Sequence, residues 1–359
     1  MKKILSLALC ALMLVSMLAL VGCGDDNQDD QSTPTTKAPE TTKATEPTQP
    51  NNDNNDNNDN NNAAAKFGSA LYVSNVAATD ADEENNGKGT MDVTVAAVIV
   101  DGEGKIVACE LDTLQTAVAF TIDGKAIAND SFLTKYEKGD EYKMVAFGGA
   151  KAEWYAQADS FENVVAGKTI AEVKALLIEG GKGNDEVANA GCTIAIAEFV
   201  NAIEKAVANA KTEVDPTATL KVTTYTEQTC KDAGADDGSN KVSVCTFAAA
   251  IKDGKVVTAD SDCVEADFKF DVDGFVNFDA SKAILSKREQ GDNYKMKNYE
   301  TGYESTWAQQ ADAFDAQCEG KTADEIAGLK GENGKGVEAV QTAGCTIAVS
   351  GLVGAASKI

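Results

Sequence analysis

The sequence predicts an α+β protein with two tandem copies of one domain, each an antiparallel sheet packed on the helices that follow it in the chain. Three observations lead to this expectation. Residue motifs recur at nearly constant spacing, segments with alternating apolar and polar residues come first in each repeat, and segments with helical periodicity come after them. We therefore place the copies at residues 67–211 and 212–359 of the 359-residue chain.

The repeat is clearest toward the end of each copy, where matching residues lie 153 positions apart. The matched pairs there are Trp154 and Trp307, Gln157 and Gln310, Phe161 and Phe314, Gly167 and Gly320, and Cys192 and Cys345. Earlier in each copy the offset is 150, as for Phe120 and Phe270. A repeat of this length indicates one folded unit present twice.

Short segments at the start of each copy have the composition of β-strands, and turn residues follow them. In the first copy the expected strands are Met91–Val100, Lys105–Glu110 and Val118–Ile122. In the second copy they are Lys241–Ile251, Lys255–Ala259 and Phe268–Val272. Asp-Gly turns at 101, 123, 253 and 273 close these strands and favour hairpins.

Helices are expected in the remainder of each copy. Trp154, Ala158 and Phe161 are spaced to share one buried helix face. Two capping boxes, Thr169 with Glu172 and Thr322 with Glu325, predict helix starts. The longest helical pattern covers Ile194–Ala208, with Phe199, Ile203 and Val207 on one stripe.

The N-terminus has the pattern of an exported, lipid-anchored bacterial protein. Lys2 and Lys3 precede an apolar run, Ile4–Val21, that is too short to be read first as a permanent membrane span. The run ends in Leu-Val-Gly-Cys, the lipobox pattern, in which Cys23 receives the lipid. We expect residues 1–22 to be a signal peptide and Cys23 to hold the protein at the outer face of the cytoplasmic membrane. The alternative is an ordinary signal peptide that contains a cysteine.

Residues 23–66 are predicted to be a disordered linker. From Gly24 to Asn62 the chain consists mainly of Thr, Pro, Asn and Asp, so it buries too little apolar surface to offset its conformational entropy. Such a segment would hold the folded part away from the membrane.

Composition excludes several classes of function. The chain has 57 acidic and 32 basic residues and a net charge of −25, which argues against nucleic acid as a partner. It has no histidine, so Ser-His-Asp catalysis and His-ligated metals are excluded. Arg288 is the only arginine. We expect no metal site, and a carrier or binding protein rather than a standalone enzyme.

Seven cysteines remain once Cys10 leaves with the signal peptide and Cys23 is acylated. Export permits disulfides, and an odd number leaves at least one thiol free or paired between molecules. We expect Cys230 and Cys245 to lie on adjacent strands, where they could form a disulfide. Cys192 and Cys345 occupy the same repeat position and are interpreted as small buried residues.

A short motif occurs once in each copy, ahead of an apolar helix. Ala-Gly-Cys-Thr ends at Thr193 and again at Thr346. Together with the strands and a Tyr-x-Met segment, it resembles the FMN-binding domain of bacterial extracytosolic lipoproteins and sodium-pumping quinone reductase subunits. In that family a flavin transferase esterifies the threonine of a Ser/Thr-Gly-Ala-Thr motif to the phosphate of FMN.

The resemblance implies a set of cofactor-binding residues in this chain. They are Gly191, Cys192 and Thr193 in the first copy, Gly344, Cys345 and Thr346 in the second, and the pairs Tyr142 and Met144, and Tyr294 and Met296. Ala190 and Ala343 stand where the family has a hydroxyl residue, and Val187 and Val340 where it has an acid. The sequence therefore leaves covalent and noncovalent FMN both open.

Each of these residues also has a purely structural interpretation. The threonines could cap the helices that follow them. The Tyr-Lys-Met segments could anchor a loop on the core, and Trp154 and Trp307 could be core residues instead of stacking on a ring.

The resemblance implies a membrane-anchored extracytosolic electron carrier, with a flavin transferase and redox proteins as partners. The alternative is a flavin-free surface protein that binds a ligand or a partner.

Overall fold

A computed structural model describes residues 64–294, 296 and 305–359. These described residues all belong to one compact unit. The signal peptide 1–22, Cys23 and nearly all of the 23–66 linker lie outside the described residues, so these three predictions stay predictions. Among the described helices, none has the length and apolar character needed to cross a bilayer.

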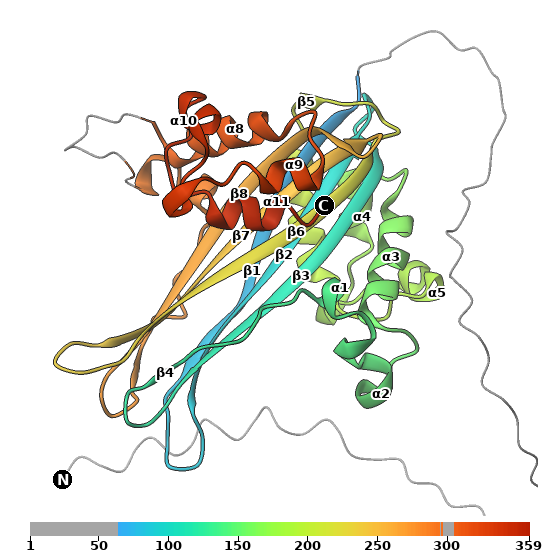
Figure 1. Cartoon of the computed structure of the whole chain (residues 1–359). Coiled ribbons are helices and arrows are strands. Elements are labelled where there is room, and N and C mark those ends of the chain that lie inside the picture. Colours follow the sequence, from blue (N-terminus) through green and yellow to red (C-terminus); the bar gives the residue numbers. More distant parts are fainter. Residues whose placement is uncertain (1–63, 295, 297–304) are drawn as a thin grey trace, which may run out of the picture. The chain divides into compact units, whose positions relative to one another are not determined.

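The structure contains two antiparallel sheets, the first from residues 66–213 and the second from residues 219–277 (Figure 1). The first has the order β4-β3-β2-β1-β5 and contains β1 (Lys66–Thr79), β2 (Gly87–Val100), β3 (Ile106–Phe120), β4 (Ala126–Ile127) and β5 (Thr212–Glu213). The second has the order β6-β7-β8-β9 and contains β6 (Thr219–Lys231), β7 (Gly238–Lys252), β8 (Lys255–Phe270) and β9 (Val276–Asn277).

Helices follow the main strands in each half. In the first half they are α1 (Lys135–Lys138), η1 (Gly139–Tyr142), α2 (Met144–Gly148), α3 (Trp154–Val165), α4 (Ile170–Ala175), η2 (Glu179–Gly181), α5 (Asp185–Ala190) and α6 (Ala197–Ala208). In the second half they are α7 (Lys287–Gln290), η3 (Gly291–Tyr294), α8 (Trp307–Cys318), α9 (Ala323–Ala327), η4 (Glu332–Gly334), α10 (Glu338–Thr342) and α11 (Ser350–Ala356).

The two sheets pack face to face, and each carries its own helices on its outer face (Figure 1). Alternate residues of a strand point to opposite faces. Val93 and Val95 of β2 therefore join Val242 and Val244 of β7 in the core between the sheets, while Ala96 packs toward the first-half helices. This central core belongs to both halves, so the apolar runs of β2 and β7 are buried on both sides.

The hairpin turns at one end of the sheets interlock. Gly124 accepts a hydrogen bond at its carbonyl from the N–H of Ala233, and Gly274 accepts the matching bond from Ala81, both 2.8–2.9 Å. An added Cβ on either glycine would meet atoms of the opposite turn at about 2.9 Å, so these sites require glycine. The two contacts are reciprocal, because the turns of each sheet supply one acceptor and one donor to the turns of the other sheet.

Most of the expected elements are confirmed, with two differences in extent. Both capping boxes are present, and Trp154, Ala158 and Phe161 are buried together on α3. Val118–Ile122 is not a separate strand, because Val118 continues β3 and Ile122 lies in the turn after it. The same holds for Phe268–Val272, since β8 runs unbroken to Phe270.

Candidate functional site

The first Gly-Cys-Thr segment is a tight loop between α5 and α6. Gly191 has φ of +113°, a conformation that side chains rarely adopt. Cys192 is buried, and Thr193 is exposed. The backbone N–H and the hydroxyl of Thr193 both donate to Oε1 of Gln157, at 2.9 and 3.0 Å. The loop is thereby fixed to α3 with its threonine at the surface.

The second half repeats this loop closely. Gly344 has φ of +111°, and Cys345 is buried. The N–H and hydroxyl of Thr346 donate to Oε1 of Gln310, at 2.8 and 3.1 Å. Thr346 is half-buried, whereas Thr193 is exposed. The two loops therefore present their threonines in the same way, with greater access to the first.

The expectation that these threonines start or cap a helix is wrong. Helix α6 begins at Ala197 with Ile196 as its N-cap, and α11 begins at Ser350 with Val349 as its N-cap. The reason is a backbone pairing between Ala195 and Lys182 that holds this stretch extended. The free amides of a helix N-terminus are therefore not at Thr193, and the helix argument for phosphate binding does not apply there.

A lysine lies beside each loop instead. Lys182 pairs with Ala195, two residues after Thr193, and Lys335 pairs with Ala348, two residues after Thr346. Within the described part of the chain, neither lysine has a carboxylate within ion-pair distance. Each loop thus has a lysine on the backbone segment that pairs with it.

The Tyr-x-Met segments pack on the same helices. Tyr142 and Met144 are partly buried against the core between the first sheet and its helices, and Tyr294 and Met296 occupy the same place in the second half. Lys135 Nζ lies 5.5 Å from the ring centroids of both Tyr142 and Trp154. Trp154 begins α3, and Gln157 follows one turn later. Lys135 thus links Tyr142 to the first residue of α3, and the Gly-Cys-Thr loop is bound one turn further along the same helix.

The expected pairing of Cys230 with Cys245 is wrong. Cys245 bonds to Cys263, its direct neighbour across β7 and β8, whereas Cys230 lies opposite Asn240. Cys192 and Cys345 are reduced and buried, as expected, and burial raises the pKa of each thiol to about 11. Neither is suited to act as a nucleophile near neutral pH.

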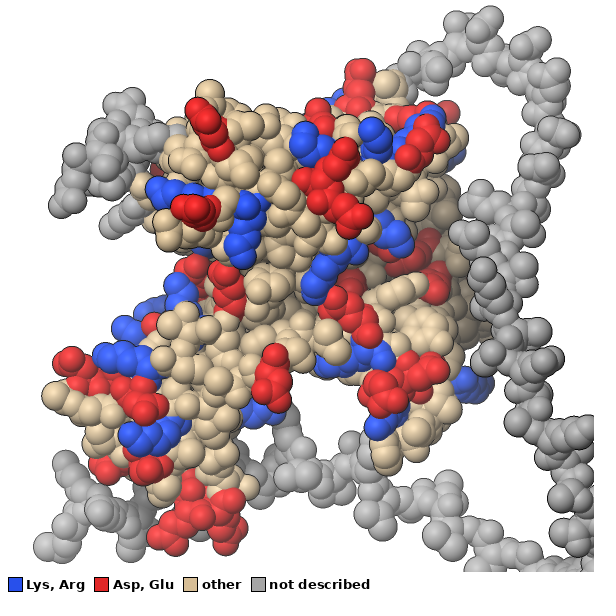
Figure 2. Space-filling view, in the orientation of Figure 1, with Lys and Arg blue, Asp and Glu red and all other residues tan. Residues whose placement is uncertain are grey.

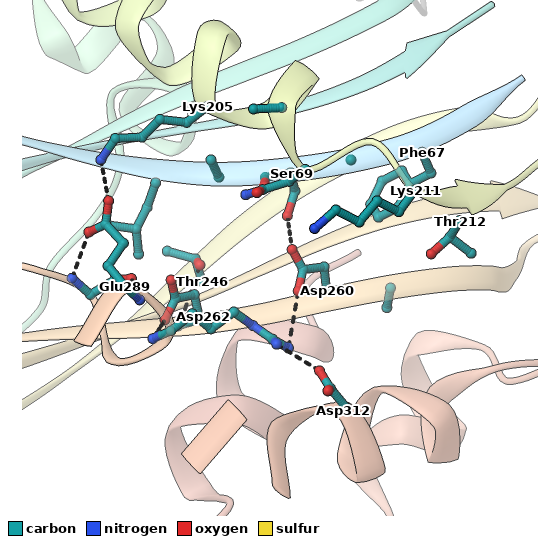
Figure 3. Close-up of a pocket in the computed structure, with 18 residues that line it drawn as sticks. Phe67, Ser69, Lys205, Lys211, Thr212, Thr246, Asp260, Asp262, Glu289 and Asp312 are labelled. Carbon is teal, nitrogen blue, oxygen red and sulfur yellow. Dashed lines mark hydrogen bonds and ion pairs between the residues drawn. The ribbon is translucent and has the colours of Figure 1, made fainter. Parts of the chain in front are cut away.

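A cavity of about 670 Å³ lies between the halves, away from both loops (Figure 3). Its walls come from β1, the end of α6 and β5 on one side, and from β8, α7 and α8 on the other. Arg288 lies in the wall. Its Nη1 contacts Asp312 at 2.6 Å, and its Nη2 contacts Asp260 at 3.0 Å and the buried Asp315 at 3.1 Å. Ser69 donates to Asp260 at 2.6 Å, which joins the two halves across the cavity.

An equivalent cavity on the opposite side is much smaller, at about 170 Å³. In both cavities a lysine near the end of a helix forms an ion pair with a glutamate of the other half. Lys205 lies 2.5 Å from Glu289 in the larger cavity, and Lys358 lies 2.7 Å from Glu137 in the smaller one. In the smaller cavity Tyr136 stands in the place of Arg288. These two equivalent positions therefore hold cavities that differ in volume and charge.

Burial raises the pKa of carboxyl groups around both cavities. In the larger one, burial raises the pKa of Asp262 to about 6 and that of Asp315 to about 7. In the smaller one, burial raises the pKa of Asp112 to about 7 and that of Glu162 to about 9. Arg288 lies near Asp315 and lowers its pKa, whereas among the described residues no cation does the same for Glu162, which fits the higher pKa of Glu162.

Sequence reasoning missed two features of these sites. Gln157 and Gln310 recur in the repeat beside the tryptophans, and that recurrence was the available signal for their role. The Arg288 cavity had no local signal, because its walls come from residues almost 200 positions apart, as in the contact of Ser69 with Asp260.

Surface charge adds no further candidate on the visible face, where basic residues are scattered among acidic ones (Figure 2). Comparison with known proteins finds no match among family models, curated proteins or solved structures.

Proposed function

We propose that the chain is an extracytosolic lipoprotein, anchored through Cys23, whose halves are two copies of one FMN-binding-like domain. The flavin is held at Thr193, at Thr346 or at both, and the protein relays electrons to and from redox partners outside the cytoplasm. The residue correspondence between the halves supports the duplication, since both repeat the same helices, loop and glutamine contact.

One observation carries the flavin proposal. Each half holds a threonine hydroxyl two residues after a glycine of positive φ, fixes it with a glutamine, and has a lysine on the backbone segment that pairs with the loop. The glycine lets the backbone approach a phosphate closely, and the lysine supplies the opposite charge.

The chain's own residues would bind and orient the cofactor. The Oγ1 atom of Thr193 would carry the phosphate, Gln157 would fix the direction of that side chain, and Lys182 would offset the phosphate charge. When bound, the flavin supplies the electron chemistry, and the protein supplies position and electrostatic surroundings. The exposed Thr193 offers a transferase easier access than the half-buried Thr346.

The test is to export the full chain together with a flavin transferase and to view a denaturing gel under ultraviolet light. Fluorescence that survives denaturation and disappears in the Thr193→Val, Thr346→Val double variant supports covalent flavin. Thr169→Val and Thr322→Val are matched controls, because these threonines cap α4 and α9 and are not part of the Gly-Cys-Thr loops.

A visible spectrum and an FMN titration of the native protein extend this test to noncovalent binding. A colourless protein that does not bind FMN in the titration refutes both forms of the flavin proposal.

The alternative function is a flavin-free surface protein that binds a small ligand or a partner. The cavity around Arg288 favours it, because its volume of about 670 Å³ lies in the range of small-molecule sites and the equivalent position is nearly closed.

A further inference from the structure

We propose that the cavity around Arg288 binds a small zwitterion, of the class of free amino acids and short peptides. The inference rests on the second of the two proposed functions and needs no flavin, because the cavity shares no residue with the Gly-Cys-Thr loops.

The first step concerns which charges of the cavity are already paired. Seven charged residues line it: Lys205, Lys211, Arg288, Asp260, Asp262, Glu289 and Asp312. Lys205 pairs with Glu289, and Arg288 pairs with Asp260 and Asp312. Within the part of the chain that the structure describes, Lys211 and Asp262 remain without an ion-pair partner. One cation and one carboxyl group are thus left over.

The second step concerns where these two groups lie. Lys211 extends into the cavity from the segment between α6 and β5, while Asp262 is on β8 toward the end marked by Glu289 (Figure 3). The Ser69–Asp260 hydrogen bond lies between them. Oδ1 of Asp262 accepts backbone N–H groups from Cys263 and Arg288, which fixes this carboxyl in place. The ammonium group of Lys211 and the carboxyl group of Asp262 therefore lie on two sides of the same cavity.

A ligand with a carboxylate and an ammonium group matches this arrangement. Its carboxylate would lie at Lys211 and its ammonium group at Asp262, so that both unpaired charges gain a partner on binding. A ligand with one charge would pair only one of the two groups. The volume of about 670 Å³ admits a free amino acid or a short peptide.

The smaller cavity lies at the equivalent position but lacks the unpaired lysine and the large volume, so the shared arrangement of strands and helices does not by itself produce them. There Lys221 lies 3.9 Å from Glu110 and Lys358 pairs with Glu137, so both of its lining lysines have carboxylate partners. Asp112 is buried at the position of Asp262. With a volume of about 170 Å³ and no unpaired lysine, this cavity is the internal comparison for the larger one.

The experiment is isothermal titration of the full chain with the twenty common amino acids and with L-alanyl-L-alanine. At least one of these zwitterions should bind. Its analogue without the amino group and its analogue without the carboxylate should each bind about tenfold more weakly or worse, since each loses a charged hydrogen bond.

Variants locate the site. Lys211→Ala and Asp262→Asn should each weaken binding about tenfold or more, and Lys211→Arg should restore most of it. Lys221→Ala and Asp112→Asn in the smaller cavity are the matched controls and should leave binding unchanged. Lys211 is exposed, so its variants test the site even if the aspartate variants fold poorly.

Three outcomes would overturn the inference: absence of binding by every zwitterion, equal binding of a single-charge analogue, or binding that survives Lys211→Ala. The second outcome would still support a ligand-binding function, which separates failure of the zwitterion class from failure of that function.

Discussion

Replacing Glu162 by glutamine should change how the stability of the protein depends on pH. Oε1 of Glu162 accepts the N–H of Leu111 at 2.7 Å, and burial, reinforced by Glu110, raises the pKa of this carboxyl to about 9. In the unfolded chain its pKa is near 4.5. Between these values the folded protein holds a proton on Glu162 that the unfolded chain releases, so folding becomes less favourable as pH rises.

The magnitude follows from the proton count. One proton difference changes the free energy of unfolding by about 1.4 kcal/mol per pH unit. Over two pH units, from 5.5 to 7.5, Glu162 should therefore remove about 2.7 kcal/mol of stability. Glutamine does not titrate and retains an acceptor for the N–H of Leu111. The Glu162→Gln variant should therefore not show this loss of stability with rising pH, and it should be more stable than the wild type at pH 7.5.

The assay is thermal unfolding followed by circular dichroism at pH 5.5, 6.5 and 7.5. For a folded unit of this size, about 1.4 kcal/mol corresponds to roughly 3 °C, so the midpoint difference between variant and wild type should grow by roughly 3 °C per pH unit. Glu110 and Asp112 also have raised pKa values and titrate in both proteins. For this reason the difference between the two curves is the quantity to compare.

Glu172→Gln is the control. Hydrogen bonds from the Thr169 backbone and side chain lower the pKa of this exposed carboxyl below 4.5. The stabilising effect of the Glu172 carboxylate is therefore lost only at pH values below the range of 5.5 to 7.5 that the assay covers. Parallel pH profiles for Glu162→Gln and wild type would refute the assignment of a protonated, buried Glu162.

Three further outcomes are expected. Phe120→Ala should lower the free energy of unfolding by about 3–5 kcal/mol, because this fully buried ring stacks on Phe270 of the other half; a loss under 1 kcal/mol in denaturant titrations would contradict that contact. A non-reduced peptide digest should contain a Cys245–Cys263 crosslink, and its reduction should cost about 3 kcal/mol of stability; a different linkage in the mass spectrum would disprove the pairing. Gln157→Leu should cost about 1–3 kcal/mol and speed amide exchange in the loop it holds, since two donors lose their acceptor; unchanged exchange rates would show that the loop is held in another way.

The local structure was largely predictable from the sequence. The capping boxes at Thr169 and Thr322 depend on residues three positions apart, and the α3 face depends on residues within two turns. Both signals are local, so no knowledge of the rest of the fold was needed.

The face-to-face packing of the sheets was harder to foresee. Val93–Val100 is buried along its whole length, so the alternation that marks a half-exposed strand is absent there. A continuous apolar run indicates that both faces of the strand are buried, but it does not identify which elements pack against each face. Here one cover is the set of helices and the other is the second sheet.

The Gly-Cys-Thr loops show a different limit. Helical periodicity from Ile194 onward favoured a helix start next to Thr193, but pairing of Ala195 with Lys182 delays the helix to Ala197. A single backbone pairing with a residue thirteen positions upstream thus decided where the helix begins, and hydropathy carries no signal for it.

The joining of both halves in one chain has a consequence for the two cavities. In a symmetric dimer of identical subunits, each residue would appear at both equivalent positions, so both cavities would have an arginine or both a tyrosine. Here Arg288 occupies one position and Tyr136 the other, and the cavity volumes are about 670 and 170 Å³. Covalent linkage lets a single substitution alter one cavity while the other remains as it was, so the two cavities can diverge in volume and charge within one molecule.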